Sequence, residues 1–231
     1  KFLQPLSKAQ PINEGAMKLL PHGALGFCAM SQPGLSVQTM YATALDGDDN
    51  VQKSLNEFES ETGLSVEKDI EPGLMGDVVV AVYPSSDTKA RPVEAIMALT
   101  TANGANPKNL ATKVREAIVR KSAESGDHSI QVASEAIDGG TLWTFGSQKS
   151  GDQTIQPCYA ETEKGVFVAL SPEFLKSALA GRNGAQSLAD SDEGKWSGGE
   201  HLWVRATAVG QFVELALPVE SSGPREVFVY P

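Results

Sequence analysis

Apolar residues in this chain gather in short runs, and polar segments rich in Gly, Pro, Asn and Asp separate them. Residues 24–30 and 35–45 predict an opening pair of strands, with Gln32-Pro33-Gly34 as the turn between them. Val51, Leu55 and Phe58 then recur at spacings of four and three, which is typical of the apolar side of an amphipathic helix.

A unit of two strands and a capped helix is predicted twice. Gly63 is suited to end the first helix, and an acidic turn then leads into apolar strands at 78–83 and 93–99. Asn106-Pro107 opens the helix that follows them, and Ser171-Pro172 opens the corresponding helix after strands at 159–162 and 165–170. Two further strand pairs are predicted, at 130–136 with 141–145 and at 201–209 with 211–217.

Strands outnumber helices and follow one another in pairs, which favours an α+β fold with a mainly antiparallel sheet and helices packed on one face. Residues 1–20 predict an irregular N-terminal segment, because prolines and glycine interrupt a weak polar pattern. The repeated unit divides the remainder into residues 21–122 and 123–231. Two related halves and one continuous domain both fit this pattern.

The charge balance bears on the kind of partner. The chain has 29 acidic and 19 basic residues, a net charge of -10, and no dense basic stripe, so a nucleic-acid partner is not expected. No apolar run reaches the roughly 18 residues that span a bilayer. Because the chain begins at Lys1 rather than Met, a signal or membrane anchor upstream stays open.

The two cysteines, Cys28 and Cys158, stand among apolar, strand-like neighbours. That setting is typical of buried free thiols. A disulfide between them is the alternative in an exported protein, and spacing alone does not decide it.

Three segments together resemble a bacterial family known as domain of unknown function 3352, over residues 20–217. The matching stretches are 62–78, with Thr62-Gly63-Leu64-Ser65 and Glu67-Lys68-Asp69-Ile70, then 92–120, and then 166–190, with Ser187-Leu188-Ala189-Asp190. The resemblance implies an extracytoplasmic domain, periplasmic or at the cell surface, because members are typically exported or membrane-tethered. The family carries no assigned catalytic residues, so the resemblance implies none here.

One segment has oxygen ligands at the spacing of a calcium loop. Asp46, Asp48, Asn50 and Glu57 fall at its first, third, fifth and twelfth positions. The sixth position, which needs Gly for a tight turn, is Val51. Acidic residues are also common at the start of a helix, which accounts for the same four residues. No metal site is therefore predicted, and these residues are a weak candidate.

No motif for catalysis or cofactor binding stands out. His22, His128 and His201 lack metal-binding spacing, and no strained serine elbow or phosphate-binding loop occurs. No cofactor is therefore expected. Trp143 and Trp203 alternate with polar residues on predicted strands, which favours the core, whereas Trp196 lies in a polar loop suited to binding.

The sequence thus favours a non-enzymatic module with a binding or structural role in the bacterial cell envelope. Its partner would be a protein, a peptide or an envelope component, bound through a sheet face or through Trp196, His201 and Trp203. The alternative is a hydrolase whose site is assembled from dispersed carboxylates and His201.

Overall fold

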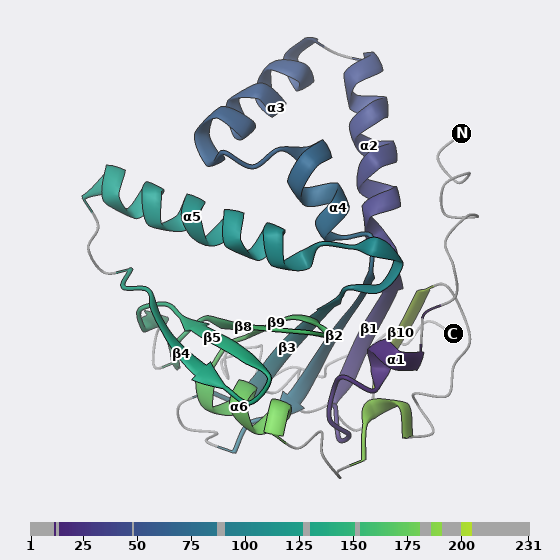
Figure 1. The fold of residues 1–231 in the computed structure, drawn as a ribbon, viewed down its shortest axis with the longest axis vertical. Coiled ribbons are helices and arrows are strands. Elements are labelled where there is room, and N and C mark those ends of the chain that lie inside the picture. Colours follow the sequence, from purple (N-terminus) through teal and green to yellow (C-terminus); the bar gives the residue numbers. More distant parts are fainter. Residues whose placement is uncertain are drawn as a thin grey trace, which may run out of the picture.

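A single antiparallel sheet of eight strands forms the centre of the molecule, with helices above and below it (Figure 1). The computed structural model describes residues 12, 14–47, 49–86, 91–126, 130–150, 153–180, 186–190 and 200–204. The α+β class and the mainly antiparallel sheet expected from the sequence are confirmed.

The elements have the following bounds. The strands of the sheet are β1 (Gly26–Ser31), β2 (Asp77–Pro84), β3 (Val93–Thr100), β4 (Ala133–Ile137), β5 (Gly140–Thr144), β8 (Cys158–Thr162), β9 (Gly165–Ala169) and β10 (Glu200–Val204), and a separate hairpin consists of β6 (Gln148–Ser150) and β7 (Gln153–Ile155). The helices are α1 (Glu14–Met17), α2 (Pro33–Gly47), α3 (Asp49–Thr62), α4 (Glu71–Gly73), α5 (Pro107–Ser125) and α6 (Pro172–Ala180), with the short turns η2 (Val66–Ile70), η3 (Ala102–Gly104) and η5 (Leu188–Asp190). Across the sheet the order is β10-β1-β2-β3-β9-β8-β5-β4.

Both strand–strand–helix units form as predicted. Asn106 Oδ1 accepts a hydrogen bond from the Asn109 N–H at 3.2 Å, which caps α5. Ser171 Oγ accepts one from the Phe174 N–H at 3.3 Å, which caps α6. In each helix Pro takes the first position, where a missing N–H costs nothing.

Helices cover both faces of the sheet, so the prediction that they pack on one face is wrong. Alternate residues of a strand point to opposite faces, and in β3 Ile96 and Ala98 belong to one buried cluster while Leu99 belongs to another. The central strands are therefore apolar on both sides, and each side must be covered. A continuous apolar run such as residues 78–82 already contained this signal.

One face is closed by α1, α6 and η5. Its buried cluster includes Phe27, Val79, Phe167 and Leu175, each at most 3% exposed. Tyr83 packs on Phe174 at a ring distance of 5.3 Å and donates its hydroxyl to the Pro21 carbonyl at 2.7 Å. We call this side the closed face.

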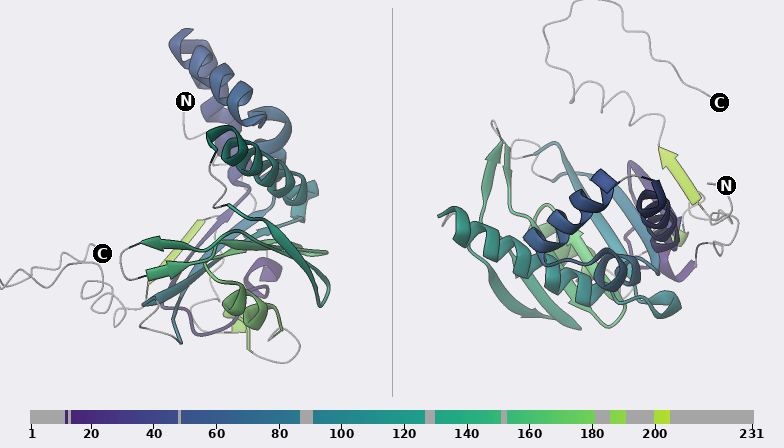
Figure 2. Two further views of the ribbon diagram at one scale, coloured as in Figure 1. Left: turned by 90° about the vertical axis from the view of Figure 1, so that its left-hand side faces the viewer. Right: turned by 90° about the horizontal axis from the view of Figure 1, so that it is seen from above.

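The other face carries α5, with α4, η2, α2 and α3 stacked beyond it. Figure 2 shows α5 crossing over the strands and the α2–α3 pair rising further from the sheet. We call this side the α5 face. Within the described residues, the buried apolar cluster on this face consists of Val78, Leu99, Tyr159 and Val166.

Residues 35–45 form helix α2 rather than the predicted strand. Gln32 turns the chain with a φ of 49°, and Pro33 then stands at the first helical position. Thr39 and Thr43 donate their hydroxyls to the carbonyls of Leu35 and Thr39, four residues back, as helical residues do. Pro-Gly, which we interpreted as a turn, therefore begins a helix.

The acidic turn predicted after Gly63 is helical. Ser65 Oγ accepts from the Lys68 N–H, and Asp69 Oδ2 accepts from the Ser65 N–H at 2.9 Å. These two bonds cap η2 reciprocally, and α4 continues from it. The α3 end at Gly63 is as predicted, with a φ of +66°.

The two strand–strand–helix units share one sheet, because β3 pairs directly with β9. Their helices differ in placement, since α5 covers one face and α6 the other. Of the strand pair expected at 201–209 and 211–217, residues 201–204 lie in β10, which pairs with β1, and the rest lies outside the described residues.

Both cysteines are free, with Cys158 buried and Cys28 partly buried. Strand β1, which carries Cys28, is separated from β8 by three strands. At about 4.8 Å between neighbours, the two cysteines stand roughly 19 Å apart. A disulfide needs Cα atoms within about 7 Å, so the free-thiol interpretation holds and the disulfide is wrong.

Within the described ranges, no helix combines the length and the apolar character needed to cross a membrane.

Candidate functional site: the pocket between α5 and the sheet

A cavity of about 380 Å³ lies between α5 and the sheet. Its roof is one side of α5, where residues recur at spacings of three and four. Its floor is the α5 face of β3, β9 and β8, and the segments before β4 and around β6 close its end. The lining residues are Met97, Leu99, Pro107, Leu110, Ala111, Val114, Arg115, Ile118, Ile130, Phe145, Gln148, Pro157, Cys158, Tyr159, Val166 and Val168.

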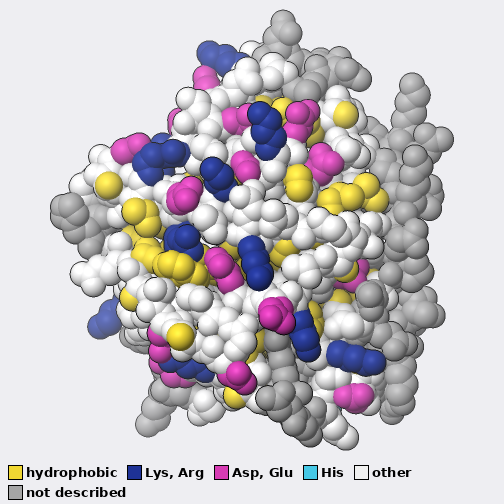
Figure 3. Space-filling model, in the orientation of Figure 1, with side chains coloured by type: hydrophobic (Ala, Val, Ile, Leu, Met, Phe, Trp, Pro, Cys, Tyr) yellow, Lys and Arg dark blue, Asp and Glu magenta, His cyan; other side chains and the backbone are white. Residues whose placement is uncertain are grey.

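Nearly every lining side chain is apolar. Figure 3 shows apolar side chains gathered where α5 approaches the strands. Val114 is 37% exposed although it lines the cavity, so the pocket reaches the surface along α5.

Hydrogen bonds to the outer helices hold α5 on the side away from the sheet. Asn109 Nδ2 donates to Asp69 Oδ1 of η2 at 3.0 Å, and the Asn106 N–H donates to the Pro72 carbonyl at 2.9 Å. Near the other end of α5, Arg120 Nη2 donates to the Glu61 carbonyl of α3 at 2.9 Å. These bonds hold α5 to the outer helices, and the space beneath it is left incompletely filled.

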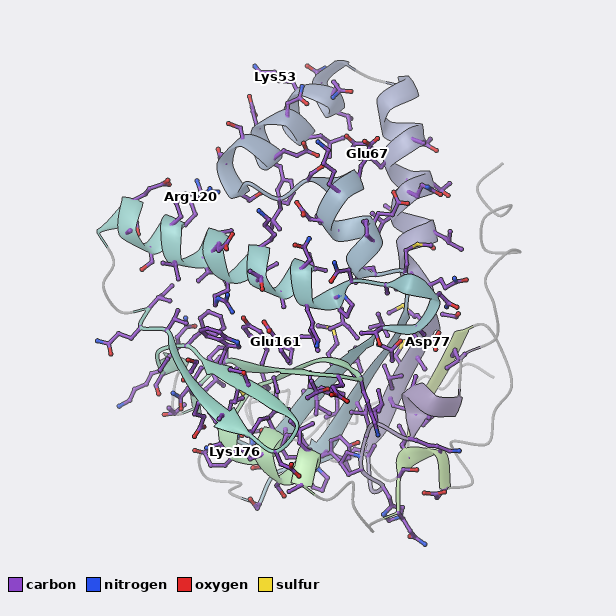
Figure 4. The ribbon with its side chains drawn as sticks, in the orientation of Figure 1. Lys53, Glu67, Asp77, Arg120, Glu161 and Lys176 are labelled. Atoms are coloured by element: carbon purple, nitrogen blue, oxygen red, sulfur yellow. The ribbon has the colours of Figure 1, made fainter. Side chains whose placement is uncertain are left out.

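Arg115 projects from α5 toward β8 and β5 and forms a polar cluster with Tyr159, Glu161 and Trp143. Arg115 donates a short hydrogen bond to the Tyr159 hydroxyl, and its Nη1 lies 3.7 Å from Glu161 Oε1. Its guanidinium carbon stands 3.8 Å from the ring centre of Trp143. Trp143 in turn stacks on Tyr159 at 6.3 Å, with the rings inclined by 15°. In Figure 4, Glu161 lies between α5 and the sheet, whereas Lys176 lies on the closed side.

This cluster leaves two buried polar atoms without a hydrogen bond in the described part of the chain, Trp143 Nε1 and Glu161 Oε1. Burial raises the pKa of Tyr159 to about 12; the Arg115 charge lowers it and the Glu161 charge raises it. The phenol is therefore a neutral hydrogen-bonding group at physiological pH.

Among the described residues that line the pocket, one carries a thiol. Cys158 borders the pocket through β8, but it belongs to the buried cluster of the closed face, where its thiol donates to the Ala169 carbonyl, and burial raises the pKa of that thiol to about 12. A thiol that stays protonated is a poor nucleophile. The described ranges also hold no group of three or more His, Cys, Asp or Glu placed to bind a metal ion.

None of the binding residues proposed from the sequence is among the described residues that line this pocket. His201 and Trp203 belong to β10, where their Cα partners across the strand pair are Ala29 and Phe27. Strand β10 is the edge of the sheet, and β1 and β2 separate it from β3. Trp196 and His128 lie outside the described residues. His22 is exposed near the start of the sheet.

The weak calcium candidates are spread over two helices. Asp46 lies in α2, Asn50 and Glu57 lie in α3, and Asp48 is outside the described residues. Glu57 pairs with Lys53 at 3.8 Å. Helix α3 begins at Asp49, inside the segment that a calcium loop would need in a non-helical form.

The sequence interpretation missed Arg115, Tyr159 and Glu161. The spacing of Leu110, Val114 and Ile118 predicts one apolar side of the helix that Asn106-Pro107 opens. Arg115 lies on that same side, four residues after Ala111 and three before Ile118. The position of charged Arg115 on the apolar side of this helix is the signal in the sequence that could have indicated a site.

No family model, curated protein or solved structure matches the chain. The resemblance to the family of unknown function therefore stays a prediction.

Proposed function

We propose that this chain is a binding protein, without chemistry of its own, that holds an apolar small molecule between α5 and the sheet. The observation that carries the proposal is the cavity itself. Its volume of about 380 Å³ falls within the roughly 300–1,000 Å³ of typical ligand sites, and its walls are apolar with a few polar groups at one place.

The contrast between the two sheet faces supports a role for this cavity. The closed face packs into a continuous buried cluster, as protein interiors normally do. On the α5 face, Met97, Ala111 and Val168 are only partly buried although helices overlie them. Leaving apolar surface uncovered costs stability, and an apolar ligand would recover it.

The proposal includes an extracytoplasmic setting in a bacterial envelope, for which the family resemblance is the support. An apolar envelope component would then be a natural ligand. Within the described ranges no histidine lines the pocket, so its lining does not supply the base that the hydrolase alternative needs.

A matched pair of variants on α5 tests the binding function. Val114 lines the pocket and is 37% exposed, whereas Val119 is 45% exposed and does not line it. The uncharged fluorophore N-phenylnaphthylamine should bind the native chain with enhanced emission. Val114→Glu should weaken its binding by about tenfold or more, because a carboxylate at the pocket wall loses hydration.

Val119→Glu is the control and should leave binding within about twofold of the native chain. Circular dichroism checks that both variants stay folded. If the native chain does not bind the fluorophore, or if the two variants weaken binding equally, the pocket is not the site and the proposed function fails.

A further inference from the structure

Arg115 connects the roof of the pocket to its floor. Its backbone belongs to α5, and its guanidinium meets side chains of β8 and β5 in the sheet. It donates a hydrogen bond to the Tyr159 hydroxyl, lies 3.7 Å from Glu161 Oε1 and stands 3.8 Å from the ring centre of Trp143. Tyr159 is hydrogen-bonded to Glu161 as well. Three side chains of the sheet thus fix the end of Arg115.

Arg115 is also the longest of the described side chains through which α5 lines the pocket. The others are apolar, and Ala111, one turn earlier, ends at a methyl group. Hydrogen bonds from Asn109 and Arg120 fix α5 to η2 and α3, but these partners belong to the outer helices. The distance between α5 and the sheet therefore depends on the side chains beneath α5, and Arg115 is the one with charged and hydrogen-bonded anchors on both sides of the gap.

Stability alone does not account for this arrangement. The side chains of Arg115 and Glu161 are only 17% and 22% exposed, so both charges have lost much of their hydration. In the described part of the chain, Trp143 Nε1 and Glu161 Oε1 are buried without a hydrogen bond, which adds to the cost. Replacing a buried ion pair by apolar residues of similar volume is often neutral or stabilising.

We infer, on the basis of the proposed binding function, that Arg115 is a positioning residue that keeps the pocket open before a ligand enters. Fixed to Tyr159 and Glu161, it holds α5 away from the sheet, so the apolar walls do not close on each other. A pocket that is already open spares the ligand the cost of separating those walls. Arg115 acts through the position of α5, and no hydrogen bond to the ligand is required.

The double variant Arg115→Leu/Glu161→Leu tests this inference, because it removes the ion pair without leaving a buried charge unpaired. Helix α5 should then settle onto the sheet and reduce the pocket. N-phenylnaphthylamine should bind about tenfold more weakly or worse. The midpoint of urea denaturation should equal or exceed that of the native chain. A cluster with a structural role alone would lower this midpoint.

Two further variants accompany it. Lys113 and Glu116 also form an ion pair on α5, at 4.0 Å, and neither is among the described residues that line the pocket. Lys113→Leu/Glu116→Leu is therefore the matched control and should bind within about twofold of the native chain. Arg115→Lys retains a long side chain with the same charge, and it should bind the fluorophore at least about threefold more tightly than the double variant at position 115 and 161.

Cyclooctane, a saturated hydrocarbon, separates an open pocket from direct contact between Arg115 and the fluorophore rings. Measured by displacement of N-phenylnaphthylamine, its affinity should fall in Arg115→Leu/Glu161→Leu as much as that of the fluorophore. If only the fluorophore loses affinity, Arg115 contacts the ligand directly and the inference is overturned. Native binding in this variant, or a midpoint that falls together with binding, overturns it too. If the native chain binds neither ligand, the proposed function itself fails.

Discussion

Cys158 shows how burial of one ionisable side chain makes stability depend on pH. The residue is 1% exposed, and burial raises the pKa of the thiol from 9.0 to about 12. A group with a raised folded pKa contributes stability that is complete below its unfolded pKa. That contribution is lost as the pH rises from about 9 toward 12, because only the unfolded chain releases the proton there.

We therefore predict that the native chain loses more stability than Cys158→Ala between pH 8.5 and 10.5, taken as roughly the lower half of that window. Urea denaturation at several pH values measures the free energy of unfolding of both proteins. The cavity left by the substitution lowers the variant's stability by the same amount at every pH. A difference between the two proteins that does not change with pH would contradict the prediction.

Individual residues of the pocket could be predicted only in part. The spacing of Leu110, Val114 and Ile118 was enough to predict a helix with one apolar side. Whether that side packs directly on the sheet or borders a cavity depends on the distance between α5 and the sheet. Contacts such as Asn109 with Asp69 fix that distance, and they join residues 40 positions apart, which local pattern does not reveal.

At the scale of elements, the attachment of α5 to η2 determines the roof of the pocket. Asp69 is buried at 9% exposure and its two oxygens are used separately, one by the Ser65 N–H and one by Asn109. Asn109→Ala leaves Asp69 Oδ1 without that donor. We expect a loss of about 1–2 kcal/mol in unfolding free energy, partly offset by the better helix propensity of Ala.

A double-mutant cycle with Asp69→Ala separates these effects. The coupling between the two positions should be about 1 kcal/mol, measured by urea denaturation of the four proteins. Lys108→Ala, at the exposed neighbouring position, is the control and should change stability by less than about 0.5 kcal/mol. Strictly additive losses at Asp69 and Asn109 would mean that the bond does not hold α5.

The elements that the sequence predicted correctly are those whose signals are local and consistent. Strands β2, β3, β8 and β9 combine apolar runs with bounding turns, and α5 and α6 begin at a capping residue before Pro. Residues 35–45 were misassigned because their apolar positions fit a strand and a helix about equally well. The deciding feature was the backbone at Gln32, whose positive φ ends β1 abruptly.

At the scale of the whole molecule, the sheet separates two interiors of different character. The closed face holds the larger buried cluster, and the α5 face surrounds a cavity. Val79 on β2 is 0% exposed within the closed cluster, whereas Val168 on β9 is partly buried and lines the pocket. The same substitution at these two positions therefore compares the two faces directly.

Val79→Ala should lower the free energy of unfolding by about 2–3 kcal/mol, because close packing around it leaves a new cavity. Val168→Ala should cost less than about 1 kcal/mol, since the removed methyl groups already face open space. Urea denaturation of both variants measures these losses, and N-phenylnaphthylamine binding should persist in Val168→Ala because the substitution only enlarges the pocket. Equal losses at the two positions would mean that the α5 face is as tightly packed in solution as the closed face, and a face packed in that way would leave no room for a ligand.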